Sequence, residues 1–347
     1  MQNSIYNYLA EAGQRAPSAG NMQPWFFHEK NNELLLYIDL EKLEGSYFNR
    51  EHPVTLLAVG AVIENIIQVA QLNNIDLEFD YFPPLDSGKC ATFKVKNKNT
   101  KRPDKIERPA IFNRCTTRLP FNKKIIPQNI LDELLSLSTA NAQLAVYQSK
   151  EEISLWSKWL CIASEARFRT PNIHQWFEKT LKFTPEEIAT REGVDIKLLE
   201  LPAIATLILK AAQAWKQMNL CNKFYIYKLL AKLEMLNVDA APALIGIIAS
   251  PGIPFAVESG RLMEKMWIKA NELGLSVQPY YVVSDQMYRL KKGIIPSNLE
   301  ASIIHLDNEI NSILKLENVF IYILFRVGYC DKSPKRSFRH LVGLKDK

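Results

Sequence analysis

The sequence lacks the patterns that mark metal sites and disulfide-stapled proteins. Its five cysteines are scattered, odd in number and free of CxxC spacing: Cys90, Cys115, Cys161, Cys221 and Cys330. This usage favours reduced thiols and a cytoplasmic location over a disulfide framework. The five histidines are equally dispersed and contain no HExxH or HxxxH pair. We therefore expect no metal ion.

Signals for export and for crossing a membrane are also missing. The first residues, Met1–Ser4, lack the basic and apolar regions of a secretory signal. The longest uncharged apolar run, Ala240–Val257, is interrupted by three prolines. We expect it to form a buried strand and turn rather than a membrane span.

The net charge and the glycine patterns limit the kinds of ligand that the protein is expected to bind. A net charge of +6 over 347 residues is modest, which favours an anionic small ligand over nucleic acid, and no nucleic-acid-binding module is recognisable. The dinucleotide-binding pattern G-x-G-x-x-G does not occur. Hydrophobic residues make up 47% of the chain, enough for a large core in two domains or in one large α/β unit.

The segment Ala16–Trp25 is the most informative stretch of the chain. Two prolines and a glycine break regular structure here, so we expect an irregular loop between an N-terminal helix and a strand beginning near Trp25. Three polar side chains lie in this loop: Ser18, Asn21 and Gln23. Small polar groups and exposed backbone N–H groups suit the hydrogen-bonding edge of a heteroaromatic ring. A polar connecting loop without a ligand is the alternative.

Two motifs together resemble the nitroreductase-like FMN oxidoreductases. The loop reads P-S-x-x-N-x-Q-P-W, similar to the flavin-edge loop of that family, and Arg114–Phe121 looks like its R-x-S-x-R-x-F opening. Two guanidiniums at this spacing can present several charge-assisted donors to one phosphate. The resemblance implies that Ser18, Asn21 and Gln23 contact the flavin edge. It also implies that Arg114 and Arg118 contact the FMN phosphate, and Thr116 the phosphate or the pyrimidine side of the ring.

Two further segments near the C-terminus carry the same resemblance. Lys335 and Arg336 follow an apolar strand expected at Val319–Phe325, and they are similar to the family's terminal basic segment, which meets the same phosphate. Alone, such a cluster would indicate a solvated loop. The stretch Gly274–Tyr281 matches the family's Gly-x-x-x-x-Pro turn beside the flavin N5, which implies contacts from Gln278, Pro279 and Tyr280. Relatives often have a small or acidic residue after the proline, so Tyr280 and Tyr281 can instead be core aromatics. No catalytic residue is identified.

An internal similarity at an offset of 200 residues relates Val54–Leu77 to Pro254–Val277. Both segments have apolar residues at i, i+3, i+4 and i+7, the period of a buried helix stripe. Three positions are identical: Gly60 and Gly260, Glu64 and Glu264, and Ala70 and Ala270. This agreement is either chance between two amphipathic helices or the sign of two copies of one fold in one chain.

The distribution of motifs favours two complementary copies. The first copy has the Ser18 loop but no R-x-S-x-R opening, and the second has the opening but no P-S-x-x-N loop. In two-subunit relatives each flavin is shared across the interface, and the single-chain Acg-type branch of the family joins both halves covalently. The resemblance thus implies an α+β, nitroreductase-like fold duplicated in one chain, with two α/β/α sandwich halves forming a pseudo-dimer. We expect a first half at 1–105, a second at 106–347, and one FMN site.

The second half contains an insertion at about 151–240 that the first lacks. We expect helices at Ile153–Arg167, Pro185–Glu192 and Leu201–Met235, and the resemblance implies a lid over the flavin. Four residues near its first bend are candidates for the lid wall: Arg167, Arg169, His174 and Trp176. The lysine-rich, apolar stretch Leu201–Met235 could lie on an anionic membrane, but a lid or a subunit contact is more economical. We therefore expect no membrane contact.

The resemblance implies an FMN-dependent oxidoreductase. Hydride would pass from NAD(P)H to an electron-poor acceptor such as a nitroaromatic or a quinone, with the chemistry residing in the cofactor. Two alternatives remain open. One is an FMN-binding, sequestering protein whose lid blocks NAD(P)H, and the other is a specialised oxidase that works with a partner enzyme. The chain would be a monomeric pseudo-dimer or would pair again as a homodimer.

Overall fold

A computed structural model describes residues 4–81, 87–97, 109–201, 203–315 and 318–344. The α-helices are α1 (Ile5–Gly13), α2 (Leu40–Leu43), α3 (Pro53–Leu72), α4 (Pro109–Asn113), α5 (Gln128–Leu135), α6 (Lys150–Phe168), α7 (Pro171–Thr180), α8 (Pro185–Ala189), α9 (Ala203–Ala211), α10 (Trp215–Lys223), α11 (Ile226–Asp239), α12 (Ile253–Glu272), α13 (Val282–Lys291) and α14 (Ser297–Leu314). The strands are β1 (Trp25–Lys30), β2 (Glu33–Ile38), β3 (Leu77–Tyr81), β4 (Lys89–Val95), β5 (Gln143–Tyr147), β6 (Leu181–Lys182), β7 (Val194–Asp195), β8 (Ala243–Ala249), β9 (Ser276–Tyr280) and β10 (Phe320–Gly328).

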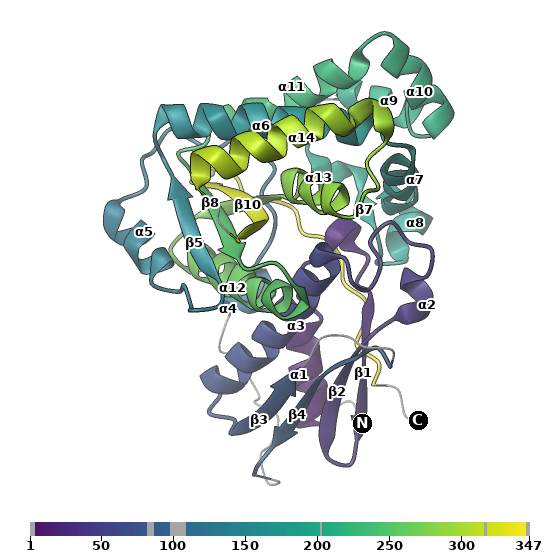
Figure 1. Cartoon of the computed structure of the whole chain (residues 1–347). Coiled ribbons are helices and arrows are strands. Elements are labelled where there is room, and N and C mark those ends of the chain that lie inside the picture. Colours follow the sequence, from purple (N-terminus) through teal and green to yellow (C-terminus); the bar gives the residue numbers. More distant parts are fainter. Residues whose placement is uncertain (1–3, 82–86, 98–108, 202, 316–317, 345–347) are drawn as a thin grey trace.

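Two four-stranded antiparallel sheets occupy the two halves of the molecule (Figure 1). The first sheet has the order β1-β2-β4-β3 and the second the order β5-β8-β10-β9. Strand β10 is buried along its whole length, as is nearly all of β8. The apolar run expected to form a buried strand and turn does so, because β8 lies inside it and α12 begins after Gly252. The mixed α+β content agrees with the expected class.

The two segments related by the 200-residue offset form the central helix pair, α3 and α12, which pack against each other between the sheets (Figure 1). The helices have the same length, and each is followed by a strand, β3 or β9, at nearly the same spacing. Helix α3 is also the one helix among the described residues that is long and apolar enough to span a membrane. It is buried inside the protein along that length, as the central helix of a core would be.

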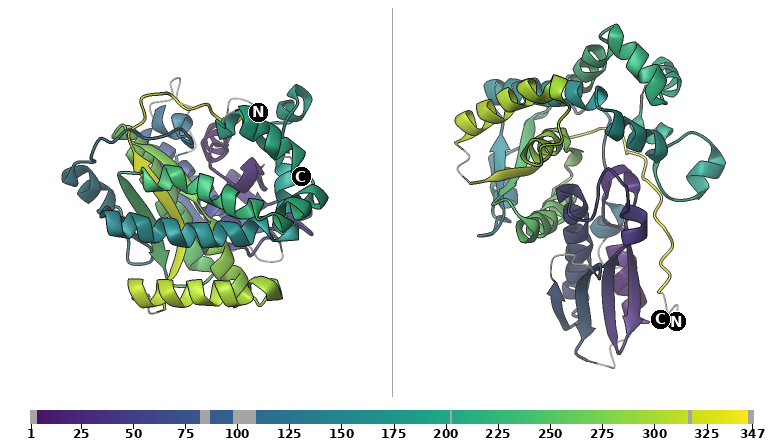
Figure 2. Two further views of the ribbon diagram at one scale, coloured as in Figure 1. Left: turned by 90° about the horizontal axis from the view of Figure 1, so that it is seen from above. Right: turned by 45° about the vertical axis from the view of Figure 1, so that its right-hand side comes forward.

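The halves differ in how their sheets are covered. Helices α12 and α13 contact the second sheet, and α6 and α14 pack with α13, so helices lie on both sides of it (Figure 2). In the first sheet, α1 and α3 pack against the strands, while side chains such as Phe26 and Tyr37 stack on each other half-buried. Among the described residues this half is therefore a two-layer unit, and the expected α/β/α sandwich is found only in the second half. The predicted boundary between residues 105 and 106 lies outside the described residues.

The segment 151–240 is mostly helical, but its helices do not form a single unit. Helix α6 is a core helix, with Trp156 and Trp159 buried, and it packs against α11, α13 and α14. The stretch expected as one helix at Leu201–Met235 is divided into α9, α10 and α11, and Tyr225 at the last break has a left-handed φ of 60°. After β10 the chain runs back along the first half, as the yellow segment of Figure 2 shows.

Candidate functional site

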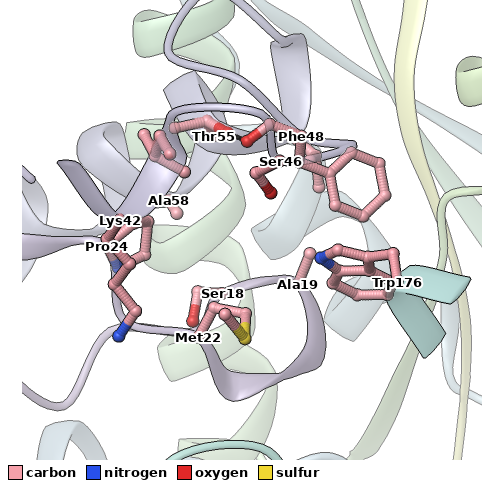
Figure 3. Close-up of a pocket in the computed structure, with 12 residues that line it drawn as sticks. Ser18, Ala19, Met22, Pro24, Lys42, Ser46, Phe48, Thr55, Ala58 and Trp176 are labelled. Carbon is pink, nitrogen blue, oxygen red and sulfur yellow. Dashed lines mark hydrogen bonds between the residues drawn. The ribbon is translucent and has the colours of Figure 1, made fainter. Parts of the chain in front are cut away.

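A pocket opens beside the loop that precedes β1. Its walls are apolar and carry three hydroxyls and one ammonium group, and the space between them measures about 330 Å³, part of it open to solvent (Figure 3). Its lining residues are Ser18, Ala19, Met22, Pro24, Lys42, Leu43, Ser46, Phe48, Val54, Thr55, Ala58 and Trp176. All but Trp176 come from the first half. Of the four wall candidates in the insertion, only Trp176 lines this pocket.

The loop is held in shape by its own polar groups and by a glycine. The Ser18 hydroxyl accepts a hydrogen bond of 2.9 Å from the backbone N–H of Gln23. Gly20 has a φ of +56°, and a Cβ placed there would lie 2.8 Å from the Trp176 ring. Glycine therefore permits both the turn and the close approach of α7 to the loop.

The side-chain amides of Asn21 and Gln23 are already engaged by protein groups. The Asn21 amide donates to the carbonyls of Gly193 at 3.0 Å and Phe338 at 3.1 Å. Its oxygen accepts from Arg339 at 2.7 Å. Gln23 donates to the Arg191 carbonyl at 2.8 Å, and its oxygen accepts from the backbone N–H of His340 at 2.8 Å and from Gln14 at 2.9 Å. We refer to these contacts among the loop, residues 191–193 and residues 338–340 as the clasp.

The clasp is extended by charged contacts. Lys42 pairs with Glu192 at 2.6 Å, and His340 Nε2 lies 3.4 Å from the same carboxylate. Arg191 donates to the Arg339 carbonyl at 3.4 Å, and its guanidinium lies 5.9 Å from the centre of the Phe338 ring. Residues 191–193 and the C-terminal segment are therefore fastened to the loop and to each other.

Beneath the loop lies a group of guanidiniums that we call the arginine cluster: Arg15, Arg114, Arg336 and Arg339. Arg114 is buried and its Nε lies 2.9 Å from the Glu264 carboxylate on α12. It also donates to the Arg15 carbonyl at 3.0 Å and lies 4.5 Å from the centre of the Trp267 ring. Arg336 is exposed and donates to Asn113, next to Arg114, at 2.6 Å. Its neighbour Lys335 is also exposed.

Positive charge exceeds negative charge in the arginine cluster. Burial, reinforced by the nearby Arg114 guanidinium, lowers the pKa of Arg339 to about 9. Burial also lowers the pKa of Arg15, and Arg336 adds to that effect. Glu264 is fully buried, so burial raises its pKa although Arg114 opposes the shift. A set of partly buried cations around one carboxylate is an environment that an added anion would stabilise.

The remaining predicted residues meet at the edge of the second sheet. The backbone N–H of Thr117 bonds to the Val277 carbonyl at 2.9 Å, which fastens the Arg114–Arg118 segment to β9. Arg118 donates to the Leu198 carbonyl at 3.2 Å, and burial lowers its pKa. Thr116 is half-buried in this segment. Gln278 and Pro279 lie in β9 and pair with β10, so the expected Gly274–Tyr281 turn is mostly an edge strand.

Arg326 is the central residue of this second group. It is fully buried and donates to Gln278 at 2.6 Å and to the Leu119 carbonyl at 2.7 Å, and its Nη1 has no protein partner among the described residues. Burial raises the pKa of Tyr280 to about 12, although Arg326 and Arg118 oppose the shift. Tyr280 is therefore a neutral phenol between two cations at pH 7, able to donate a hydrogen bond.

A buried polar network connects the halves behind Phe48. Tyr47 donates to Asp285 at 2.7 Å and accepts from Arg289 at 2.7 Å. His52, at the N-terminus of α3, lies 3.4 Å from the same carboxylate and 3.4 Å from the Tyr281 hydroxyl. Burial lowers the pKa of His52 and raises the pKa of Tyr281 well above its usual value. Tyr281 thus belongs to this network rather than to the pocket lining.

The structure brings the two main motifs together, but the predicted site residues lie in two separate groups. The Ser18 loop meets the arginine cluster, with Arg114 and Arg336, across more than ninety residues of sequence. Arg118, Gln278 and Tyr280 form the separate group around Arg326. Sequence reasoning did not select Arg15, Arg339, Glu264 or Arg326. Arg15 directly precedes the loop and Arg339 follows Lys335 and Arg336 closely, while Glu264 is one of the identities at the 200-residue offset; these positions were the available signals.

Comparisons with known proteins give few close matches. No family model matches the chain. The uncharacterized protein MT1398 of Mycobacterium tuberculosis (strain CDC 1551 / Oshkosh) is 25% identical over 280 residues, which covers 78% of this chain and 38% of that protein. The chain thus spans well under half the length of this curated relative.

Solved structures with similar architecture include FMN-dependent nitroreductases. NfnB from Mycobacterium smegmatis, in complex with NADPH, has a TM-score of 0.37 and 12% identity, covering 65% of this chain and 87% of that one. The FMN-dependent nitroreductase from Clostridium difficile R20291 has a TM-score of 0.33 and 14% identity, covering 65% and 88%. Iodotyrosine deiodinase bound to FMN and 3-iodo-L-tyrosine has a TM-score of 0.38 and 14% identity, covering 69% and 97%. At these TM-scores the agreement in architecture is partial.

Proposed function

We propose that this chain is an FMN-dependent oxidoreductase of the nitroreductase type, which passes hydride from NAD(P)H to an electron-poor acceptor such as a nitroaromatic or a quinone. The observation that carries the proposal is the meeting of two motif-bearing segments at one place. The P-S-x-x-N loop and the R-x-T-x-R segment come from different halves, and Arg114 bonds to the carbonyl of Arg15 at the base of the loop. Neither half alone holds both motifs.

The residues at this place fit an anionic, aromatic cofactor. The arginine cluster has an excess of cations, and burial holds the pKa of Arg339 at about 9, so a phosphate would relieve the repulsion that these guanidiniums feel. Arg114 and Arg336 would hold the phosphate, with Arg15, Arg339 and the exposed Lys335 adding charge. Thr116, Arg118, Gln278, Pro279 and Tyr280 would border the ring. When bound, FMN would supply the hydride-accepting and hydride-donating chemistry.

The hydrogen bonds of the loop amides support a different part for them in this proposal. Each polar atom of the Asn21 and Gln23 amides has a protein partner in the clasp. We therefore assign Asn21 and Gln23 to fastening the C-terminal segment over the site, and leave Ser18 and the loop backbone beside the cofactor. Tyr280 would act as a neutral hydrogen-bond donor near developing negative charge, with Arg326 and Arg118 stabilising that charge.

Two equivalent positions on the central helices differ in charge, which supports a single FMN site per chain. Glu264 faces the arginine cluster. Its counterpart Glu64 lies 3.2 Å from Arg261, which also lies 3.4 Å from Glu258. Two carboxylates against one guanidinium leave no net positive charge for a phosphate. We therefore infer that the chain is a duplicated unit in which only one of two related positions binds flavin. Flavin content should saturate near one FMN per chain, and a content near two would refute this inference.

A second candidate, storage or sequestration of FMN, is favoured by the closure of the lid. Residues 191–193 bond to the loop through the clasp, Arg118 bonds to Leu198, and Trp176 lines the pocket. A cover fastened at several points would shield the flavin from nicotinamide. The two candidates predict different reactivity of the same bound cofactor.

The deciding experiment is an anaerobic absorbance titration of the purified, FMN-loaded protein with NADPH and with NADH. Prompt bleaching of the flavin band is expected for the oxidoreductase. A band that persists with both nucleotides but bleaches with dithionite would instead support sequestration. If no flavin band appears even after reconstitution with FMN, both candidates are wrong.

A further inference from the structure

The segment that contains α9, α10 and most of α11 carries about half of the exposed large apolar side chains among the residues that the structure describes. Its helices project from the end of the molecule that is remote from the first sheet (Figures 1 and 2). Among the described residues, nine of the 17 exposed large apolar side chains lie in the segment 201–236. The exposed fractions of Phe224 and Tyr225 at the α10–α11 turn are 73% and 64%. Concentrated apolar exposure of this kind on a soluble chain marks a surface that contacts something.

Helix α11 has one apolar side that is buried in the protein and a second apolar side that is exposed. Tyr227, Ala231 and Met235 are buried, and α11 packs on α6. On the opposite side Leu229, Leu233 and Leu236, at i, i+4 and i+7, are each at least half exposed. The apolar stripe that faces outward is therefore additional to the stripe that the fold already buries.

Lysines accompany the outward apolar stripe. Lys216, Lys223, Lys228 and Lys232 are all exposed, and a fifth lysine, Lys210, lies at the end of α9. No acidic residue occurs between Glu200 and Glu234, and Glu234 is paired with Arg167. We refer to the exposed apolar residues and lysines of α10 and α11 as the basic apolar face. Along the chain, no acidic residue accompanies the lysines over the more than thirty residues before Glu234.

We propose that the basic apolar face docks on an anionic phospholipid surface. Leucines of the stripe would enter the boundary between headgroups and acyl chains, the lysines would meet the anionic headgroups, and Phe224 and Tyr225 would sit at the interface. Lysine stems extend along apolar surface while their ammonium groups reach outward, which suits this mixed face. The proposal is independent of the proposed flavin chemistry.

Charge argues for a lipid surface over the two alternatives that the sequence favoured. A lid function is excluded for this stripe, because it points away from the protein and because Trp176 is the only residue of the insertion that lines the described pocket. A two-fold contact with a second copy would place the same lysine-rich face against itself, and like charges would oppose each other across that interface. An anionic surface complements the charge and the apolar stripe together.

The test is flotation of the purified full chain with two kinds of vesicle, phosphatidylcholine alone and phosphatidylcholine containing phosphatidylglycerol. We expect binding to the second kind only, weakened by salt. The double variant Leu229→Gln/Leu233→Gln should lose binding. Ile304→Gln/Ile313→Gln on α14 is the matched control, because these side chains are also exposed, and it should bind like the wild type.

Variants in which lysines are replaced by glutamine measure the electrostatic contribution to vesicle binding. The triple variant Lys223→Gln/Lys228→Gln/Lys232→Gln should weaken binding about fivefold for each lysine removed. The triple variant Lys94→Gln/Lys123→Gln/Lys332→Gln, at exposed positions elsewhere, should weaken it much less. Equal binding to both kinds of vesicle, or no binding at low salt, would overturn the proposal. So would a wild-type dimer that becomes a monomer in the leucine variant without any vesicle binding, since the face would then be a self-association surface.

Discussion

Gly60 and Gly260 meet at the crossing of α3 and α12, where the backbones of the two helices touch. A Cβ on Gly60 would lie 2.1 Å from the carbonyl oxygen of Val257, and a Cβ on Gly260 would lie 2.2 Å from that of Leu57. The contact is reciprocal, because Leu57 and Val257 are related by the same offset of 200 residues as the glycines. A two-fold interface between identical subunits has this reciprocity. The contact therefore supports the inferred duplication more strongly than three identities in sequence do.

Replacing either glycine by alanine should destabilise the protein sharply. The added methyl group would collide with a backbone carbonyl, which cannot rotate away as a side chain can. We expect Gly60→Ala or Gly260→Ala to lower the free energy of unfolding by about 3 kcal/mol or more. Urea denaturation followed by circular dichroism would measure it. Gly343→Ala is the control, since nothing lies within 4 Å of its Cβ position, and its free energy of unfolding should change by less than about 0.5 kcal/mol.

The phosphate assignment can be tested at the exposed member of the arginine cluster. Arg114→Ala would leave Glu264 buried without its partner, so a loss of flavin there could reflect unfolding. Arg336 is exposed, and its removal should spare the fold. We expect Arg336→Ala to raise the dissociation constant of FMN about tenfold or more, because a charge-assisted contact contributes roughly 1.5 to 3 kcal/mol. Fluorescence titration of apoprotein with FMN would measure this. Unchanged affinity in Arg336→Ala, or an equal loss in the control Lys332→Ala, would contradict the assignment.

Local sequence patterns predicted the secondary-structure elements that depend mainly on neighbouring residues. The breakers around Ser18 gave a loop between α1 and β1, and the apolar period of 3.6 gave α3 and α12. The basic pairs Arg114 and Arg118, and Lys335 and Arg336, were likewise readable, because the members of each pair stand close together in the chain. What the sequence could not reveal is which distant segments close over the site. Asn21 and Arg339 are 318 residues apart and meet only because the C-terminal segment returns across the molecule.

The same limit explains the differences in the insertion and in the loop amides. The sequence predicted a helix over Leu201–Met235, but the chain breaks before α10 and at Tyr225, whose left-handed φ of 60° is uncommon for a bulky residue. Asn21 and Gln23 have the right chemistry for a ligand edge, and nothing local shows that protein carbonyls use the same donors. The residue type tells which donors and acceptors a side chain has, but only the folded structure tells which partners they bind.

The buried imidazole of His52 should make the stability of the protein depend on pH. Burial lowers its pKa in the folded protein below the ordinary value of 6.5. As the pH falls through about 6.5, the unfolded chain binds a proton that the folded protein does not, so stability is lost toward acid down to the lowered pKa. We expect the melting temperature to fall between pH 7.5 and pH 5.5, and to fall less steeply in His52→Gln. His305→Gln serves as the control, because its side chain is 78% exposed. The prediction fails if both variants keep the wild-type slope.

The clasp should govern how readily the cover opens. Asn21→Ala removes the donor to Gly193 and Phe338 and the acceptor for Arg339 while leaving the Ser18 turn in place. Each lost hydrogen bond contributes about 1 kcal/mol, and the bond from the charged Arg339 guanidinium contributes more, although Arg339 keeps its bond to the Ala16 carbonyl. We therefore expect amide hydrogen exchange in peptides covering residues 188–193 and 337–341 to accelerate at least about tenfold. Exchange in the β8 and β10 strands should stay unchanged. Asn49→Ala, at an exposed position outside the clasp, should exchange like the wild type. If exchange at both segments is unaltered in Asn21→Ala, the clasp does not hold the cover, and the shielding of the site must come from Trp176 and the pocket walls.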